Sequence, residues 1–179
     1  MDGLEIKAAV EGRLPQSAQV ENAQVVSWVN SAVNIICNIY PPIKTITLTD
    51  GDLPEDYLFI AEVMSQEERY LRYTVTPDRK IYFDHAGEFE VKYHYHPPRI
   101  KQIDDVIEVA EVFHGPLVEF CLSKFWEMES EGADTGSMSM AKAYEEQFYL
   151  TAAAAAETLK GGVKVTRYIR ARPWTGGHK

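Results

Sequence analysis

Two histidines in a predicted strand are the residues best suited to metal chemistry. His94 and His96 lie two residues apart, and because side chains alternate along a strand, both would project from one face. Two imidazoles on one face can bind zinc, with His85 or Asp84 as a third ligand from the preceding turn. The simpler interpretation is that both histidines are ordinary residues of a half-buried strand. A small metal-dependent hydrolase using His94 and His96 is therefore an alternative, and we expect a non-enzymatic protein without catalytic, metal or cofactor-binding residues.

A second group of candidate residues is acidic and precedes a predicted helix. Its spacing does not follow that of a calcium-binding loop, so we expect a solvated face or favourable charge near the helix start. His114 lies directly before Gly115 and Pro116, where a role at the helix entry is more natural than catalysis. The acidic residues are Asp104, Asp105, Glu108 and Glu111.

The residues best suited to binding another macromolecule lie at 160–179. This segment carries six basic residues and no acidic one, which leaves −15 on the rest of a chain whose net charge is −9. Residues 163–170 alternate like a strand, so we predict an arm that adds a strand to another protein and anchors it with Trp174. A nucleic-acid-binding module acting through this basic tail is another alternative. The candidate binding residues are Lys164, Arg167, Tyr168, Ile169, Arg170, Arg172 and Trp174.

Helical periodicity occurs at both ends of the segment 1–160. Asp2 is suited to cap the first helix, and Tyr40-Pro41-Pro42 to end the second, because proline disfavours a helical residue before it. Gly115 is an acceptable cap for a helix that begins at Pro116, and Gly161-Gly162 is expected to end the last helix. The predicted helices are 3–14, 22–39, 116–129 and 139–159.

Between these helices the periodicity changes from 3.6 to two, which predicts strands. We expect about five short antiparallel strands, the last two forming a hairpin across residues 85–87. The strands are 43–49, 57–64, 69–76, 80–84 and 88–96. The predicted fold class is α+β: a helical bundle, made of N-terminal helices and a C-terminal helical hairpin, with an inserted antiparallel β layer and an extended C-terminal arm. The domains are a helical core at 1–42 and 99–160, a β insertion at 43–98, and a basic arm at 161–179.

The composition is that of a soluble globular domain. The chain has 179 residues, of which 45% are hydrophobic and 25% charged. No apolar run approaches the ~20 residues that span a bilayer, so we expect no membrane partner. The first residues lack the pattern of a signal peptide. Cys37 and Cys121 lie in apolar helical settings and are predicted to be buried free thiols in a reducing compartment.

Three stretches resemble the head–tail adaptor (connector, or neck) proteins of tailed bacteriophages. Trp28-Val-Asn-Ser-Ala-Val-Asn34 followed by Tyr40-Pro41 is similar to the helix of that family that ends at a proline. Leu53-Pro-Glu-Asp-Tyr-Leu-Phe-Ile60 is similar to the entry into its strand insertion. Val91-Lys-Tyr-His-Tyr-His-Pro97 is similar to its last insertion strand, after which a helical hairpin follows. The resemblance covers about residues 5–160.

The resemblance implies a structural role in a virion. Subunits of this family form a ring, expected to be a dodecamer, that docks under the portal protein through C-terminal arms. The seven candidate residues of the basic tail would then be portal-binding. The lumen would pass double-stranded DNA without sequence specificity, and a downstream neck or tail-completion protein would bind below. We therefore expect a virion protein of the neck, assembled in the host cytoplasm.

Overall fold

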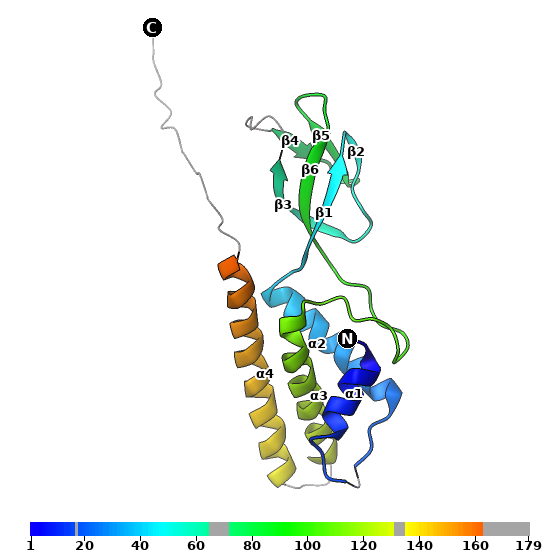
Figure 1. Ribbon diagram of the computed structural model, residues 1–179, viewed down its shortest axis with the longest axis vertical. Coiled ribbons are helices and arrows are strands. Elements are labelled where there is room, and N and C mark those ends of the chain that lie inside the picture. Colours follow the sequence, from blue (N-terminus) through cyan, green and yellow to red (C-terminus); the bar gives the residue numbers. More distant parts are fainter. Residues whose placement is uncertain (17, 65–71, 131–134, 163–179) are drawn as a thin grey trace.

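The computed structural model describes residues 1–16, 18–64, 72–130 and 135–162, with backbone only at 161–162. Within these ranges the chain has an α+β fold, in which four α-helices pack together and two three-stranded antiparallel sheets form a separate unit at one end of them (Figure 1). The predicted C-terminal arm, residues 163–179, lies outside the described residues.

The two N-terminal helices begin and end for local reasons. Helix α1 (Gly3–Glu11) is capped by Asp2, whose carboxylate accepts a hydrogen bond from the Glu5 backbone N–H at 2.9 Å while Glu5 caps Asp2 in return. It ends three residues earlier than predicted, yet Leu14 beyond it still reaches the core. Helix α2 (Asn22–Ile39) ends before Tyr40-Pro41-Pro42 as predicted.

The two later helices are both longer than predicted. Helix α3 (His114–Glu129) begins two residues before Pro116, because a proline is tolerated throughout a first turn whose N–H groups need no helical partner. Gly115 is therefore a helical residue and the cap position belongs to Phe113. A 3-10 turn, η1 (Glu111–Phe113), precedes it. Helix α4 (Thr135–Gly162) starts four residues earlier than predicted and includes Gly161 and Gly162, because glycine permits a helix end without requiring one.

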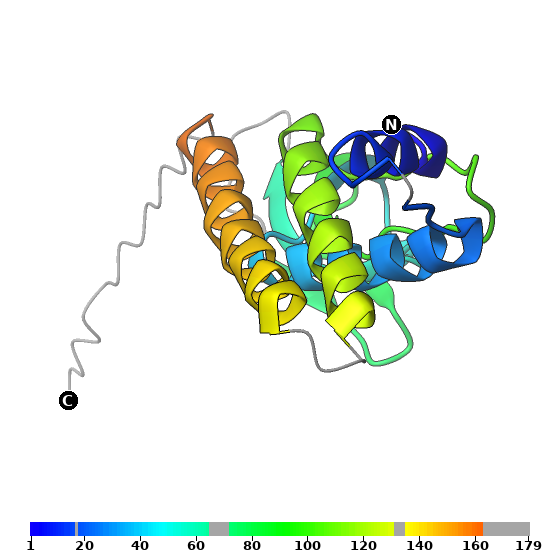
Figure 2. The ribbon, with the colours of Figure 1, turned by 90° about the horizontal axis from the view of Figure 1, so that it is seen from below.

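The helices enclose one apolar core. Helix α3 lies between α4 on one side and α1 on the other, an arrangement visible in Figure 2. The rings of Phe120 and Phe148 meet edge to face, with centroids 5.0 Å apart, and Phe125 of α3 is also buried. Cys37 and Cys121 are buried free thiols in this core, as predicted.

The described part of the insertion contains six strands in two sheets. Strand β6 is central to the first sheet, between β1 and β3, and β5 is central to the second, between β2 and β4. All pairs are antiparallel. The strands are β1 (Ile43–Leu48), β2 (Gly51–Asp52), β3 (Tyr57–Met64), β4 (Tyr73–Val75), β5 (Lys80–Phe83) and β6 (Phe89–Tyr95).

The predicted hairpin across residues 85–87 is wrong. Strand β5 pairs with β4 through a turn in which Arg79 has a positive φ of 62°, and β6 pairs with β1 and β3 instead. The prediction failed because alternation along a strand gives no information on its partner. The segment between β5 and β6 crosses from one sheet to the other, and the rings of Phe83 and Phe89, 4.1 Å apart, hold the two sheets together.

The insertion therefore has a core of its own, formed by Leu53, Ile81, Phe83, Phe89 and Val91. Its connection back to the helices is tied to α2 by one side chain. The Asn30 amide donates to the Ile100 carbonyl at 2.9 Å and accepts from the Ile100 N–H at 3.0 Å. None of the described helices has the length and apolar composition needed to cross a membrane.

We predict that Phe125→Ala lowers the free energy of unfolding by roughly 3–5 kcal/mol, the usual cost of truncating a buried phenylalanine. Val106→Ala is the control, because Val106, on the segment before α3, is 70% exposed and its truncation is expected to change stability by less than about 0.5 kcal/mol. Urea unfolding measures both. A cost below about 1 kcal/mol for Phe125→Ala would contradict the placement of this ring in the core.

Candidate functional site

The most organised polar group among the described residues lies where the insertion meets the helices. Lys44 on β1 alternates with Ile43 and Thr45, so its side chain lies on the inner face of the sheet, together with Tyr93 and Tyr95 of β6. A lysine on the inner face of a strand needs a polar partner there, because its charge would otherwise be desolvated without compensation.

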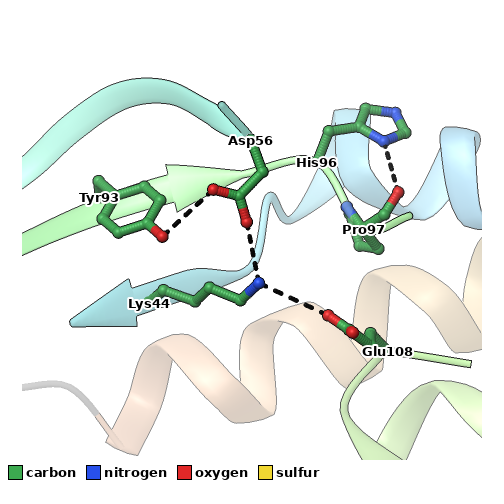
Figure 3. Close-up of polar contacts among 6 residues, drawn as sticks. All are labelled: Lys44, Asp56, Tyr93, His96, Pro97 and Glu108. Atoms are coloured by element: carbon green, nitrogen blue, oxygen red, sulfur yellow. Dashed lines mark hydrogen bonds and ion pairs between the residues drawn. The ribbon is translucent and has the colours of Figure 1, made fainter. Parts of the chain in front are cut away.

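The partners of Lys44 come from two further segments. Its ammonium Nζ lies 2.9 Å from Asp56 Oδ2, directly before β3, and 3.6 Å from Glu108 Oε2, on the segment that leads to α3 (Figure 3). The other carboxylate oxygen of Asp56 accepts a hydrogen bond from the Tyr93 hydroxyl at 3.2 Å. The ammonium also lies over the Tyr95 ring, 3.9 Å from its centroid. We call these five residues the junction cluster.

The electrostatics of the junction cluster favour its present protonation state. The hydrogen bond to Asp56 raises the pKa of Lys44 above its ordinary value, although partial burial acts in the opposite direction. Burial raises the pKa of Tyr93, and the charge of Asp56 adds to that effect. Burial likewise raises the pKa of Tyr95. Lys44 therefore stays charged and both phenols stay neutral at pH 7, so these three groups are not poised to exchange protons near neutrality.

The geometry of the cluster suits a mechanical role. Asp56 also accepts, through its backbone carbonyl, a hydrogen bond from the His96 N–H at 3.2 Å, just where β6 ends. The entry and exit of the insertion and the segment before α3 are thus held by one lysine and its carboxylate partners. What this arrangement can do is fix the orientation of the sheets relative to the helices.

The histidines considered as zinc ligands have separate environments. The Nδ1 atom of His94 lies 2.8 Å from the Pro41 carbonyl, and its ring packs on Phe59 with centroids 4.3 Å apart. The Nδ1 atom of His96 lies 2.9 Å from the Pro97 carbonyl. Among the described residues, no group of three His, Cys, Asp or Glu side chains lies close enough together to hold a metal ion. His85 and Asp84 are exposed in the β5–β6 connection.

The acidic residues before α3 do not converge either. The Asp105 carboxylate accepts hydrogen bonds from the Lys101 and Gln102 N–H groups at 2.7 and 2.9 Å, and these bonds lower its pKa. Glu108 turns toward Lys44, whereas Asp104 and Glu111 are exposed. His114 is the first residue of α3, consistent with the predicted place at the helix entry, and its partial burial lowers its pKa.

Sequence reasoning missed the junction cluster, although one signal for it was present. The strict alternation of 43–49 puts Lys44 on the same face as Ile46 and Leu48, and a charged residue within an apolar face indicates a buried partner. The seven candidate binding residues from Lys164 to Trp174 lie outside the described residues. The chain matches none of the protein-family models and none of the curated proteins with which it was compared.

We predict that Lys44 and Asp56 are energetically coupled. In a double-mutant cycle with Lys44→Met and Asp56→Asn, the coupling should approach 1 kcal/mol, the upper end for partly exposed ion pairs, because each member has further partners in the cluster. The control is Lys92→Met with Glu62→Gln, an ion pair of equal length, 2.9 Å, on the open face of the same sheet. There we expect less than about 0.5 kcal/mol. Equal couplings would show that the cluster is an ordinary surface contact.

We also predict that stability falls above about pH 10 and that the fall is less steep in Lys44→Met. The folded chain raises the pKa of Lys44, so this contribution is complete below the pKa of the unfolded state and is lost as the pH rises through the folded one. The raised pKa values of Tyr93 and Tyr95 act in the same direction, because the unfolded phenols ionise first. Urea midpoints between neutral and alkaline pH measure the slope. An unchanged slope in Lys44→Met would contradict the assignment.

Proposed function

We propose that this protein is a structural head–tail adaptor (connector) subunit of a tailed-phage neck. In this proposal it forms a homo-oligomeric ring, expected to be a dodecamer, docks on the portal protein through its C-terminal arm, and continues the channel for double-stranded DNA. A downstream neck or tail-completion protein binds the ring on the side away from the portal. The protein has no catalytic step in this role.

The observation that carries the proposal is the outer face of α4. Met140, Ala143, Gln147, Leu150 and Ala154 follow one another at steps of three and four, so they share one side of the helix, and all five are exposed and uncharged. Met138 and Tyr149 are also more than 40% exposed on this helix. An exposed helix face of this length that is uncharged and mostly apolar marks a protein contact more often than a solvated surface.

The residues that carry the family resemblance also support the proposal, because they define how the insertion is mounted. Asn30, from the first stretch, binds the returning chain at Ile100. Asp56, from the second stretch, and Tyr93, from the third, belong to the junction cluster. A ring subunit needs its two parts in a fixed relative orientation, since any error in one subunit is repeated around the ring.

The charge distribution fits the proposed channel. An acidic body repels the phosphates of DNA, so DNA can slide past it without binding. The tail has the opposite sign and lies directly after α4, which makes it the segment suited to an acidic partner such as a portal surface.

We predict that truncation after Lys160 leaves the melting temperature of the protein nearly unchanged but abolishes binding to the portal. The reason is that both buried clusters are complete within residues 6–156. The measurements are thermal unfolding of the isolated protein and negative-stain imaging after mixing with the portal of the same phage. In the phage, the truncated gene should give heads that package DNA but leak it or lack tails. Stable, tailed particles would refute the proposed role of the arm.

Trp174→Ala in the full chain measures how much this one side chain contributes to portal binding, as distinct from the whole arm. We expect portal binding to weaken by about 2 kcal/mol or more, as for other aromatic hot spots. Trp126→Ala is unsuitable as a control because Trp126 packs against the core. The replacement of Lys179 by alanine, which removes one charge beyond Trp174, is the matched control and should have little effect.

A further inference from the structure

Among the described strands, β1 has an open edge. Strand β1 is the outer strand of its sheet, and its six residues pair with β6 in continuous register from Ile43–His94 to Leu48–Phe89. The Tyr95 N–H donates to the Pro42 carbonyl at 3.1 Å, so Pro42 and Tyr95 occupy a hydrogen-bonded position of the antiparallel ladder. In an antiparallel ladder such pairs alternate, so Lys44, Ile46 and Leu48 bond to β6.

It follows that Ile43, Thr45 and Thr47 direct their N–H and C=O groups away from β6. Within the described part of the chain, no hydrogen bond joins these backbone groups to any other segment. All three residues are exposed. The edge therefore offers three donors and three acceptors in a regular row, which is a template for a further strand.

The other edge of the same sheet is protected. The pairing of β3 with β6 has two irregularities, between Tyr57 and Phe59 and between Ile60 and Glu62, and bulges of this kind turn an edge away from regular pairing. On β1 the only charged residue is Lys44, and its ammonium is held on the inner face by Asp56. An inward-pointing lysine is one of the usual guards of an edge strand, but here the charge of Lys44 is already compensated by Asp56 within the subunit.

We propose that residues 163–170 of a second copy of this chain add to β1 as a fourth strand. This inference rests on the proposed ring and specifies a contact between its subunits. The segment Val163-Lys-Val-Thr-Arg-Tyr-Ile-Arg170 alternates over eight residues and reaches roughly 26 Å when extended, enough to cover all of β1. One set of its side chains, Val163, Val165, Arg167 and Ile169, would lie on the face that includes Ile46 and Leu48, and three of these four are apolar.

Charge complementarity favours this occupant. Residues 163–170 contain Lys164, Arg167 and Arg170 and no acidic residue. Glu90 is the cross-strand neighbour of Thr47, and Asp50 and Asp52 follow β1 directly, whereas Lys92, opposite Thr45, is already paired with Glu62. Glu90, Asp50 and Asp52 are all exposed.

The donor is a second copy because of where α4 ends. In Figure 1 the C-terminal end of α4 lies on the side of the insertion formed by β3, and β1 lies on the opposite side. If residues 163–170 form the added strand, pairing would begin directly after Gly162 and leave no length to pass around β3 and β6 of the same subunit. A segment that leaves one side of a subunit and binds the opposite side of the next makes a head-to-tail contact, which closes into a ring when the rotation allows. Lys164, Tyr168 and Arg170 remain on the other face of the strand, where a portal can contact them.

The test is self-association of the purified full chain without portal, measured by sedimentation velocity over a range of concentrations. Thr45→Pro removes an outward N–H but keeps the pairing with β6, a position where proline is tolerated. Ala61→Pro, at the second irregularity of β3, is the matched control on the other edge. We expect the full chain to self-associate, Thr45→Pro to weaken association at least about tenfold, and Ala61→Pro to leave it unchanged.

A second variant tests the tail without touching the folded part. Val165→Pro with Thr166→Pro removes both adjacent N–H groups, one of which must face β1, and keeps every basic residue. Loss of association in this variant supports strand addition, whereas retention shows attraction by charge alone and overturns it. A monomeric full chain, or folded Thr45→Pro that associates normally, overturns it as well. Portal binding is measured separately, so portal binding without edge-dependent self-association refutes this inference alone, and the reverse result refutes the proposed docking role alone.

Discussion

The charge of Lys44 on the inner face of β1 is the constraint on which the mounting of the insertion depends. On a sheet face that includes Ile46, Val91 and Tyr93, the partly exposed ammonium of Lys44 is paired with two carboxylates. Asp56 arrives from the turn before β3, and Glu108 arrives from outside the insertion. Each ion pair is partly exposed and contributes little alone. Together they join the sheets to the helices at one point, because Asp56 belongs to the insertion and Glu108 to the segment that leads to α3.

The packing of the helices depends on burial of apolar side chains, since their core is apolar and large. Phe120, Phe148 and Leu117 hold α3 against its neighbours by burial, which is strong but not directional. The polar ties at the connections supply the direction: Asn30 fixes the chain at Ile100, and the junction cluster fixes it at Glu108. Stability and orientation are thus provided by different residues, and a variant can lose one while keeping the other.

The sequence allowed the elements to be predicted better than their partners. The change of period at residue 43 and the proline pair after Tyr40 act locally, so the helices and most strands were located within a few residues. The pairing of β6 with β1 and β3 depends on contacts distant in sequence, and no local pattern distinguished it from a β5–β6 hairpin. The junction cluster was missed for the same reason: Lys44 signalled the need for a partner, but nothing near it in sequence identified Asp56 or Glu108. His94 and His96 show the converse, because their spacing suggested a shared ligand, whereas each ring bonds to a different proline carbonyl.

The ion pair that holds the Lys44 side chain on the inner face of the sheet also affects the open edge of β1. A lysine on the inner face of an edge strand ordinarily discourages pairing, because an added strand would cover its charge. Here Asp56 compensates that charge, so the interaction that orients the insertion also weakens this protection of β1. The carboxylates of Glu90, Asp50 and Asp52 favour the binding of a basic strand at this edge over an acidic one. They therefore disfavour pairing with the acidic segments that make up most of the chain. The charged residues of the insertion thus orient its sheets relative to the helices and also favour a basic strand at the edge of β1.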